Sequence, residues 1–402
     1  MDSAELIEQR LQPAPSARGT NQSGMRAHNE RLVLSLVRRG GPLSKAEIAR
    51  LTGLSAQTVS VIMRKLEAEG LLKKDKRVRG KIGQPSVPMS LNAEGAFFFG
   101  LKVGRRSVEL VLTDFEGTLR EHRKETYPFP TPDRVMAFAR TALAEMLATL
   151  TASQQERVGG LGVAFPYHMW EWQVPGAEGL KDWQSFDIAG ALRAITDLPV
   201  YLCNDTSAAC GAELVFGAQD KPSDFLYLYI GYFAGGGLVL DSKLYTGKTG
   251  NAAALGSMPL PAGSSPTRQL VDVASLAVLE AMLKKAGVTR EASWALPDAW
   301  HFPEAIRDAW LDSAAAGLAQ TVLAASCLID FDTVVVDGTV PEAIRADLVQ
   351  RISKQLEGNP LAGIVPPKLR EGTVGSDARS LGAASLPLSD RFLVDRNVLT
   401  KV

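Results

Sequence analysis

The stretch LSKAEIARLTGLSAQTVSVIMRKLEAEGLL, residues 43–72, predicts two short helices joined by a tight turn. Ser44 and Glu47 have the spacing of a capping box, which begins the first helix. Gly53 supplies the turn, and Ser55 is placed to cap the second helix. Two helices around a glycine-containing turn of this length are a helix-turn-helix.

The residues that follow extend this motif into a winged helix-turn-helix. A strand begins at Leu71, KKDKRVRGKIGQP at residues 73–85 is typical of a hairpin tip, and SVPMSLN at residues 86–92 suits the returning strand. We therefore expect a winged helix-turn-helix domain over residues 26–91. Residues 1–25 are rich in Pro, Ala, Ser, Gly and Gln and predict a flexible tail.

Charge is distributed unevenly along the chain. The whole chain has 44 Lys/Arg and 44 Asp/Glu, but residues 26–91 hold 14 of the former and 5 of the latter, a net of +9. Residues 92–402 hold 28 and 36, a net of −8. A small basic module joined to a large acidic body indicates contact with nucleic acid at one end only.

The candidate DNA contacts lie on the second helix and the wing. Polar side chains on a recognition helix reach base edges in the major groove, and wing cations neutralise phosphates. An ordinary solvated face is the alternative, but six Lys/Arg gather within residues 73–81, opposed only by Asp75, directly after the helix-turn-helix. The residues assigned to binding double-stranded DNA are Ser55, Gln57, Thr58, Ser60, Arg64, Lys76, Arg77, Arg79 and Lys81.

From Phe97 onward the pattern is that of a duplicated α/β body. Strands joined by tight turns lead into alternating helices and strands, and a second series begins near residue 225, a period close to 130 residues. We expect one lobe over residues 92–217, a second over residues 218–388, and a C-terminal tail over residues 389–402. Ligands usually bind in the cleft between two such lobes.

Two segments of the body carry candidate ligand-binding residues. Asn204 and Asp205 follow a strand and begin a helix, where Asp205 could orient a ligand hydroxyl, act as a base, or merely cap the helix together with Thr206. Aromatic residues gather in an irregular segment, where they could stack on a sugar ring or fill a core; these are His168, Trp170, Trp172 and Trp183.

Cysteine and histidine usage argues against a metal centre and a disulfide framework. The three cysteines form no CxxC pair, and the four histidines lack metal-ligand spacing. We expect no metal, no cofactor and a reducing, cytoplasmic location without a secretory signal. Residues 313–329 carry no charge, but their alanine content favours a buried core helix over a membrane span.

Residues 26–388 resemble the ROK family, whose members include sugar kinases and sugar-responsive regulators. The resemblance rests on the winged helix-turn-helix and on NDTSAACGAELVFG at 204–217, GGGLVLDSKLYTGKTGNAAALGSM at 235–258 and GSDARSLGAA at 375–384. It implies a two-lobed, actin-like or hexokinase-like fold, and a fused winged helix-turn-helix is typical of the regulators. Asp205 corresponds to the kinase base.

Several positions depart from the family pattern. The Asp of the first phosphate motif is replaced by Lys102, and the sugar-binding Glu and His fall at Ala254 and Ser257. Asp337 stands where glycine is usual in the adenosine segment, and the zinc-binding cysteine-rich segment is absent. These losses favour a regulator over a kinase, because phosphoryl transfer depends on positioning and on charge neutralisation.

The sequence therefore predicts a transcriptional regulator, expected to be a sugar-responsive repressor of carbohydrate genes. The resemblance implies a homodimer or homotetramer, which suits two recognition helices reading a near-palindromic operator. The alternatives are a sugar kinase that retains Asp205 as its base, and a regulator controlled by a protein partner. The sugar or polyol effector is expected between the lobes, at Asn204, Asp205, His168, Trp170, Trp183 and Ser257.

Overall fold

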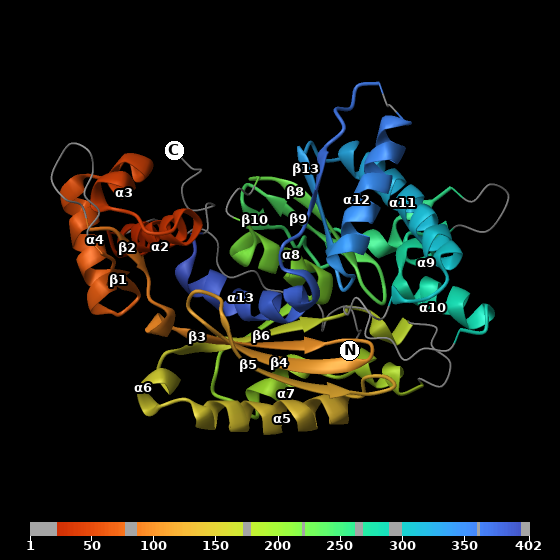
Figure 1. The fold of residues 1–402 in the computed structure, drawn as a ribbon. Helices are drawn as coiled ribbons and strands as arrows, with labels where there is room; N and C mark the ends of the chain where they lie inside the picture. Colours follow the sequence, from red (N-terminus) through yellow and green to blue (C-terminus); the bar gives the residue numbers. More distant parts are fainter. Residues whose placement is uncertain are drawn as a thin grey trace. The chain divides into compact units, whose positions relative to one another are not determined.

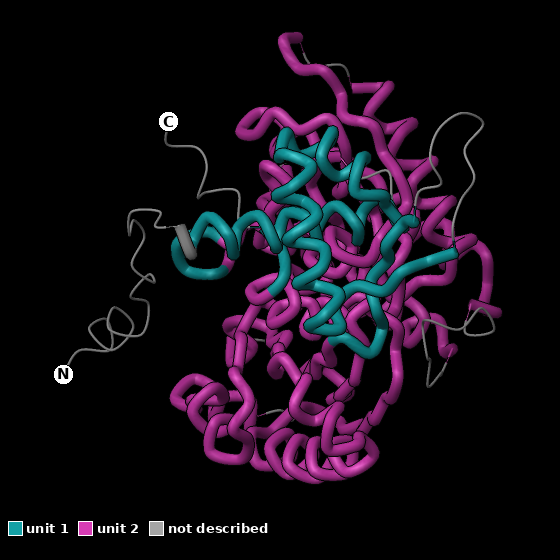
Figure 2. Tube along the Cα trace, turned by 90° about the vertical axis from the view of Figure 1, so that its left-hand side faces the viewer, with its two compact units in different colours: residues 1–95, 247–250, 392–402 teal, residues 96–246, 251–391 magenta. Residues whose placement is uncertain are grey.

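The computed structural model describes residues 22–76, 87–171, 178–218, 222–261, 268–288, 300–359 and 362–394 (Figure 1). The chain forms two compact units (Figure 2). The first comprises residues 1–95, 247–250 and 392–402, and the second comprises residues 96–246 and 251–391.

The first unit is a winged helix-turn-helix. Its helices are α2 (Gln22–Gly40), α3 (Lys45–Thr52) and α4 (Ala56–Ala68), and its strands β1 (Leu72–Lys74) and β2 (Met89–Leu91) pair antiparallel. The capping box of Ser44 and Glu47 is present, and Gly53 ends α3 in the left-handed conformation. The predicted tail is wrong over residues 22–25, where α2 begins; residues 1–21 lie outside the described residues.

The second unit contains two five-stranded sheets of the same topology. The first has the order β5-β4-β3-β6-β7 and the second β10-β9-β8-β13-β14. In each, an antiparallel three-stranded hairpin series is extended by two parallel strands, which confirms the predicted duplication. The bounds are β3 (Phe97–Val103), β4 (Ser107–Asp114), β5 (Leu119–Thr126), β6 (Val158–Phe165), β7 (Val200–Asn204), β8 (Phe225–Ile230), β9 (Gly235–Leu240), β10 (Lys243–Leu244), β13 (Thr333–Gly338) and β14 (Lys368–Glu371).

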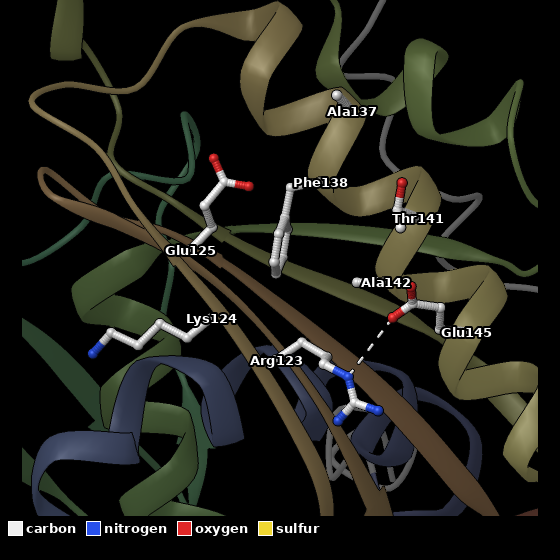
Figure 3. Close-up of a pocket in the computed structure, with 8 residues that line it drawn as sticks. All are labelled: Arg123, Lys124, Glu125, Ala137, Phe138, Thr141, Ala142 and Glu145. Atoms are coloured by element: carbon white, nitrogen blue, oxygen red, sulfur yellow. Dashed lines mark ion pairs between the residues drawn. The ribbon is translucent and has the colours of Figure 1, made fainter.

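One face of the first sheet is covered by α5 (Pro132–Thr149) and α7 (Ile188–Arg193), with the short α6 (Ala152–Gln155) following α5. A shallow pocket of about 330 Å³ lies between β5 and α5 (Figure 3). Its lining is Arg123, Lys124, Glu125, Ala137, Phe138, Thr141, Ala142 and Glu145, and none of the predicted site residues is among them.

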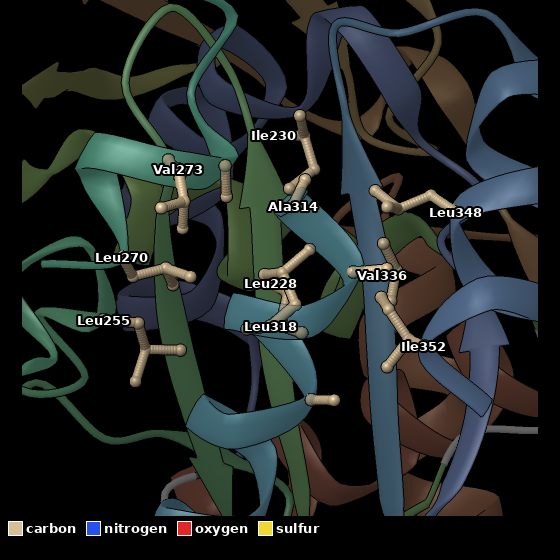
Figure 4. Close-up of a cluster of buried hydrophobic side chains, with 14 of the residues drawn as sticks. Leu228, Ile230, Leu255, Leu270, Val273, Ala314, Leu318, Val336, Leu348 and Ile352 are labelled. Atoms are coloured by element: carbon tan, nitrogen blue, oxygen red, sulfur yellow. The ribbon is translucent and has the colours of Figure 1, made fainter. Parts of the chain in front are cut away.

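The second sheet is covered by α9 (Val271–Ala274), α10 (Leu276–Lys285), α11 (Glu304–Ser326) and α12 (Glu342–Glu357). Figure 4 shows Leu228 of the sheet beside Leu318 of α11, and Val336 of the sheet beside Ile352 of α12. The prediction of a buried core helix near residues 313–329 is confirmed by α11. Within the described part of the chain, no helix is both long and apolar enough to span a bilayer.

Two helices, α8 (Asp205–Phe216) and α13 (Ala378–Phe392), lie between the sheets (Figure 1). They approach closely because small residues line the contact: a Cβ on Gly382 would lie 1.9 Å from the Ala208 carbonyl oxygen. A Cβ on Gly162 of β6 would lie 1.7 Å from the Ala383 carbonyl oxygen, so α13 packs on the first sheet. The two helices thus join the two halves of the second unit.

Candidate DNA interface and candidate effector site

Helix α4 presents one polar face to solvent. Gln57, Val61 and Arg64 are exposed at the spacing of a single helical face, whereas Val59 and Met63 on the opposite face are buried in the module. An amphipathic second helix of this kind is what a helix-turn-helix offers to the major groove. The structure therefore places Gln57 and Arg64 on the exposed face of α4.

Other predicted residues on α4 already bond within the module. The Ser55 hydroxyl accepts from the Thr58 amide at 3.1 Å and pairs with the Thr58 hydroxyl at 2.9 Å, so Ser55 is the N-cap of α4. The Ser60 hydroxyl accepts from the Lys45 ammonium at 3.2 Å. Gln57 and Arg64 remain the predicted contacts to base edges.

The described part of the wing shows which cations are already neutralised. Lys74 pairs with Glu67 at 2.7 Å, and Lys65 of α4 pairs with Glu30 at 2.8 Å. Lys76, a predicted phosphate contact, is exposed. The other three predicted wing contacts, Arg77, Arg79 and Lys81, lie outside the described residues.

The candidate effector site begins where β7 ends and α8 starts. The Asn204 side-chain oxygen accepts from the amides of Thr206 at 3.1 Å and Ser207 at 3.3 Å, so Asn204 is the N-cap of α8. The sequence had left this capping role to Asp205 or Thr206. Because Asn204 performs it, the Asp205 carboxylate is released for other contacts, while Asn204 keeps its amide donors.

The partner of Asp205 is Arg379, near the start of α13. The two side chains meet at 3.4 Å, and the guanidinium lies over the Tyr229 ring at 5.2 Å from its centroid. Sequence reasoning missed Arg379. The available signal was the duplication: α13 follows the last strand of its half as α8 follows the last strand of the other, so the two helix starts are equivalent.

Lys102, at the position of the lost phosphate-motif Asp, is buried in a row of charges. Its ammonium donates to Ser107 at 2.8 Å and to Glu109 at 3.0 Å, and Glu109 also pairs with Lys124 at 3.5 Å and His122 at 3.5 Å. Strand pairing places Lys102, Glu109 and Lys124 side by side across β3, β4 and β5.

Burial and neighbouring charges shift the pKa values of both Lys102 and Glu109. Burial, and then the charge of Arg379, lower the pKa of Lys102 to about 8, although Glu109 opposes this. Burial acts to raise the pKa of Glu109, but the bond from His122 and the charges of the two lysines outweigh it and hold that pKa well below its usual value. Glu109 is therefore ionised at neutral pH.

The turn between β3 and β4 is tied to the other half of the unit. Arg106 donates to both carboxylate oxygens of Glu280 in α10 at 2.7 Å and lies 4.8 Å from the centroid of the Tyr232 ring. Arg105 lies over the same ring and donates to the Pro128 carbonyl. The turn after Lys102 therefore carries two arginines that both lie over the Tyr232 ring, which follows β8 in the other half.

Asp337 occupies the segment that the resemblance assigns to adenosine. Its carboxylate is fully buried and accepts from the Gly338 amide at 2.8 Å, the Gly375 amide at 3.1 Å and the Tyr227 hydroxyl at 3.0 Å. Burial raises its pKa, although these bonds and Arg345 oppose the shift. The Asp337 carboxylate therefore bonds to groups of the chain itself in the segment where the family pattern has glycine.

The remaining predicted effector residues fall into two groups. Trp183 is buried in the core of the first half, where its indole nitrogen donates to the Pro130 carbonyl at 3.0 Å, so its ring faces are not open to a ligand. His168 and Trp170 are less buried, with ring centroids 5.1 Å apart, and they follow β6, whose end pairs with Asn204. Trp172 lies outside the described residues.

Ser257 is exposed on a short 3-10 helix, Leu255–Ser257. That helix packs on β9, since a Cβ on Gly236 would lie 2.4 Å from Leu255. The neighbouring Gly235 faces Thr206 of α8, with a Cβ position 2.7 Å from its methyl group. The structure therefore brings the elements carrying Ser257, His168, Asn204 and Asp205 to one end of the two sheets.

Comparisons with known proteins agree with this architecture. Residues 98–389 match the ROK family and residues 26–73 match a winged helix-turn-helix DNA-binding domain. An uncharacterized protein of Sinorhizobium fredii, y4fQ, is 28% identical over 379 residues, which cover 90% of this chain and 91% of that protein. The xylose repressor of Bacillus subtilis is 24% identical over 246 residues, covering 60% of this chain and 62% of the repressor.

Solved structures show the same fold. A ROK family transcriptional regulator, described as a homolog of the E. coli MLC protein, superposes with a TM-score of 0.68 over 92% of this chain and 97% of that chain, at 20% identity. The ROK hexokinase of Thermus thermophilus has a TM-score of 0.53 and 25% identity, covering 73% of this chain and 99% of its own.

These observations define a DNA-binding regulator whose body has the two-lobed fold of sugar kinases. The chain belongs to the ROK family, and the predicted resemblance is confirmed. Its winged helix-turn-helix makes it a DNA-binding transcriptional regulator of that family.

Proposed function

We propose that this regulator represses genes of carbohydrate uptake or catabolism and leaves its operator when a small polyhydroxy effector binds beside Asp205. The observation that carries the proposal is the Asp205–Arg379 contact at 3.4 Å. This contact lies at the junction of α8 and α13, and an ionised Asp205 there can accept hydrogen bonds from ligand hydroxyls. The proposal is also supported by the buried Lys102, which replaces the Asp of the family's phosphate motif. The names of the xylose repressors support the effector class.

An effector acts only through its different affinity for two conformations of the protein. A ligand hydroxyl on Asp205 competes with Arg379, and this competition shifts α8 relative to α13. The chain leaves α13 at Phe392 and enters the first unit, where the Val394 amide donates to the Ser35 hydroxyl of α2 at 3.1 Å. The C-terminal end of α13 thus offers a covalent route from the effector site to the DNA-binding module.

The test starts from genomic DNA fragments enriched by the purified full-length chain. Their binding is measured by fluorescence anisotropy with and without a panel of sugars and polyols. We expect one ligand class to release the DNA from the wild type. Asp205→Ala should bind the same DNA but no longer respond, whereas the exposed control Asp133→Ala should respond normally. A normal response of Asp205→Ala would overturn the proposal.

Two alternatives give different results in the same preparation. A kinase would consume ATP in the presence of a sugar from the panel, and a partner-controlled regulator would show no thermal shift with any of them. We also propose that the protein is a cytoplasmic homodimer or homotetramer, because paired recognition helices read near-palindromic operators. Light scattering on the purified chain, with and without operator DNA, measures the assembly.

A further inference from the structure

Positive charge exceeds negative charge in the two ion-pair groups formed by Asp205 and Glu109, the two carboxylates whose charges act on Arg379. Two carboxylates, Asp205 and Glu109, face three cations within ion-pair distance: Arg379 at 3.4 Å from Asp205, and Lys102 at 3.0 Å and Lys124 at 3.5 Å from Glu109. Glu109 is therefore already paired with two lysines, and His122 contacts it as well. Among these described residues one positive charge lacks a matching carboxylate.

The Arg379 guanidinium is incompletely used. Its contact with Asp205 is a single one at 3.4 Å, longer than the 2.7–2.9 Å typical of charge-assisted hydrogen bonds. Its Nε is buried and has no hydrogen-bond partner among the described residues. By contrast, Arg106 reaches both oxygens of Glu280 at 2.7 Å. A buried donor without an acceptor is costly, so the site favours a ligand that supplies one.

The orientation of this guanidinium suits an anion. The guanidinium carbon lies over the Tyr229 ring, 5.2 Å from its centroid. The fork formed by Nε and a terminal nitrogen matches the two oxygens of a carboxylate or a phosphate. Arg379 is one-sixth exposed (16%) and Asp205 is 12% exposed, so the pair borders solvent and is not sealed in the core.

We infer that the ligand of this site is an anionic polyol, a sugar carrying a carboxylate or a phosphate, whose anionic group pairs with Arg379 while its hydroxyls bond to Asp205 and the Asn204 amide. This inference rests on the proposed function and names the class of its effector. A neutral sugar leaves the Arg379 Nε without an acceptor. A site with an unpaired buried donor binds such a ligand much more weakly than one that supplies the acceptor.

The first experiment measures binding of matched ligands to the full chain by calorimetry. The probes are glucose, gluconate, glucuronate and glucose 6-phosphate, together with xylose and xylonate. At least one anion should bind tenfold or more tightly than its neutral parent, and the carboxylate and phosphate arms tell the two sources apart. A neutral parent that binds as tightly as its best anion, or a panel in which no anion binds, would overturn the inference.

The second experiment assigns the anion to Arg379. Arg379→Gln should weaken the bound anion by tenfold or more, and Arg379→Lys should restore part of the loss because it keeps the charge without the fork. Arg134→Gln, which alters a surface arginine paired with Glu125, serves as the matched control. Unchanged anion affinity in folded Arg379→Gln contradicts the assignment.

If Arg379→Gln does not fold, the salt dependence of ligand binding to the wild type tests the inference. Anion affinity should fall as sodium chloride rises, while the affinity of the neutral parent stays constant. Operator release separates the two proposals. A neutral sugar that releases DNA through Asp205 retains the proposed function and ends this inference. An anion that binds at Arg379 without releasing DNA does the reverse.

Discussion

Basic residues are used in opposite ways in the two units of this chain. In the winged helix-turn-helix, Arg64 and Lys76 face solvent, where their charge is available to a large polyanion. In the body, Lys102 and Arg379 are largely withdrawn from solvent and each contacts a carboxylate. Exposed cations contribute through salt-dependent association, whereas buried cations need defined partners because desolvation is expensive.

The difference shows that the body gathers its buried cations and carboxylates into one polar centre. Asp205 and Arg379 lie at the starts of α8 and α13, which are equivalent helices of the duplicated fold, and their side chains contact each other. Lys102 lies across Gly104, where a Cβ would be 2.7 Å from the ammonium nitrogen. These contacts form a polar centre that suits recognition, and mutations should separate its energetics from those of the DNA-binding face.

The largest expected effect is on stability, when the Glu109 carboxylate that pairs with the buried Lys102 is removed. Glu109→Gln should lower the free energy of unfolding by about 3–5 kcal/mol, the usual cost of stripping one partner from a buried ion pair. Urea unfolding followed by circular dichroism measures it. The exposed Glu178→Gln should change stability by less than about 0.5 kcal/mol. Equal effects of the two variants would show that the charge row contributes nothing.

The pH dependence of stability gives a second, smaller effect from the same row. The pKa of Lys102 is about 8 in the folded protein against an ordinary 10.5, so between these values the unfolded chain binds a proton that the folded chain has lost. The contribution of Lys102 to the free energy of unfolding therefore rises with pH across this window, by up to roughly 3 kcal/mol. Unfolding of wild type and Lys102→Met should show the rise at pH 8–10 only in the wild type; parallel curves would refute it.

A third prediction concerns the exposed face of α4. Gln57→Ala should cost about 1–3 kcal/mol on the preferred operator and reduce discrimination at one base pair, because a side chain that reads a base edge contributes specificity. Competition binding against operators with single base changes measures this, and Gln184→Ala on the body is the exposed control. Uniform weakening on every DNA sequence would instead make Gln57 a backbone contact.

Local patterns were enough to predict the elements of the first unit. The capping box of Ser44 and Glu47 and the left-handed Gly53 are determined by neighbours a few residues apart. In the body, strands such as β3 and β8 were predictable from runs of apolar residues. Strand β14 was missed because Lys368–Glu371 is short, polar and recognisable only beside β13.

The site itself was only half predictable. Asn204 and Asp205 were found because they stand at a strand-to-helix junction, but their partner Arg379 is distant in sequence and no local spacing connects them. The sequence also could not decide whether Trp183 serves a ligand or the core. That choice depends on Pro130 and Phe165, which become its neighbours only in the folded chain.

The smallest effect per residue is expected in the wing. Replacing Arg77 and Arg79 by Ala should weaken binding to all DNA sequences alike, because phosphate contacts carry no base information. Each lost contact should reduce the slope of log affinity against log salt by about 0.9. Anisotropy titrations between 50 and 200 mM salt, on operator and on random DNA, measure both quantities. The control is Lys74→Ala, since Lys74 is already paired with Glu67 at 2.7 Å and should leave the slope nearly unchanged. If the double variant kept the wild-type slope, or if it lost affinity for the operator alone, the wing would not be the phosphate clamp, and the contrast between exposed and buried cations would have to rest on α4.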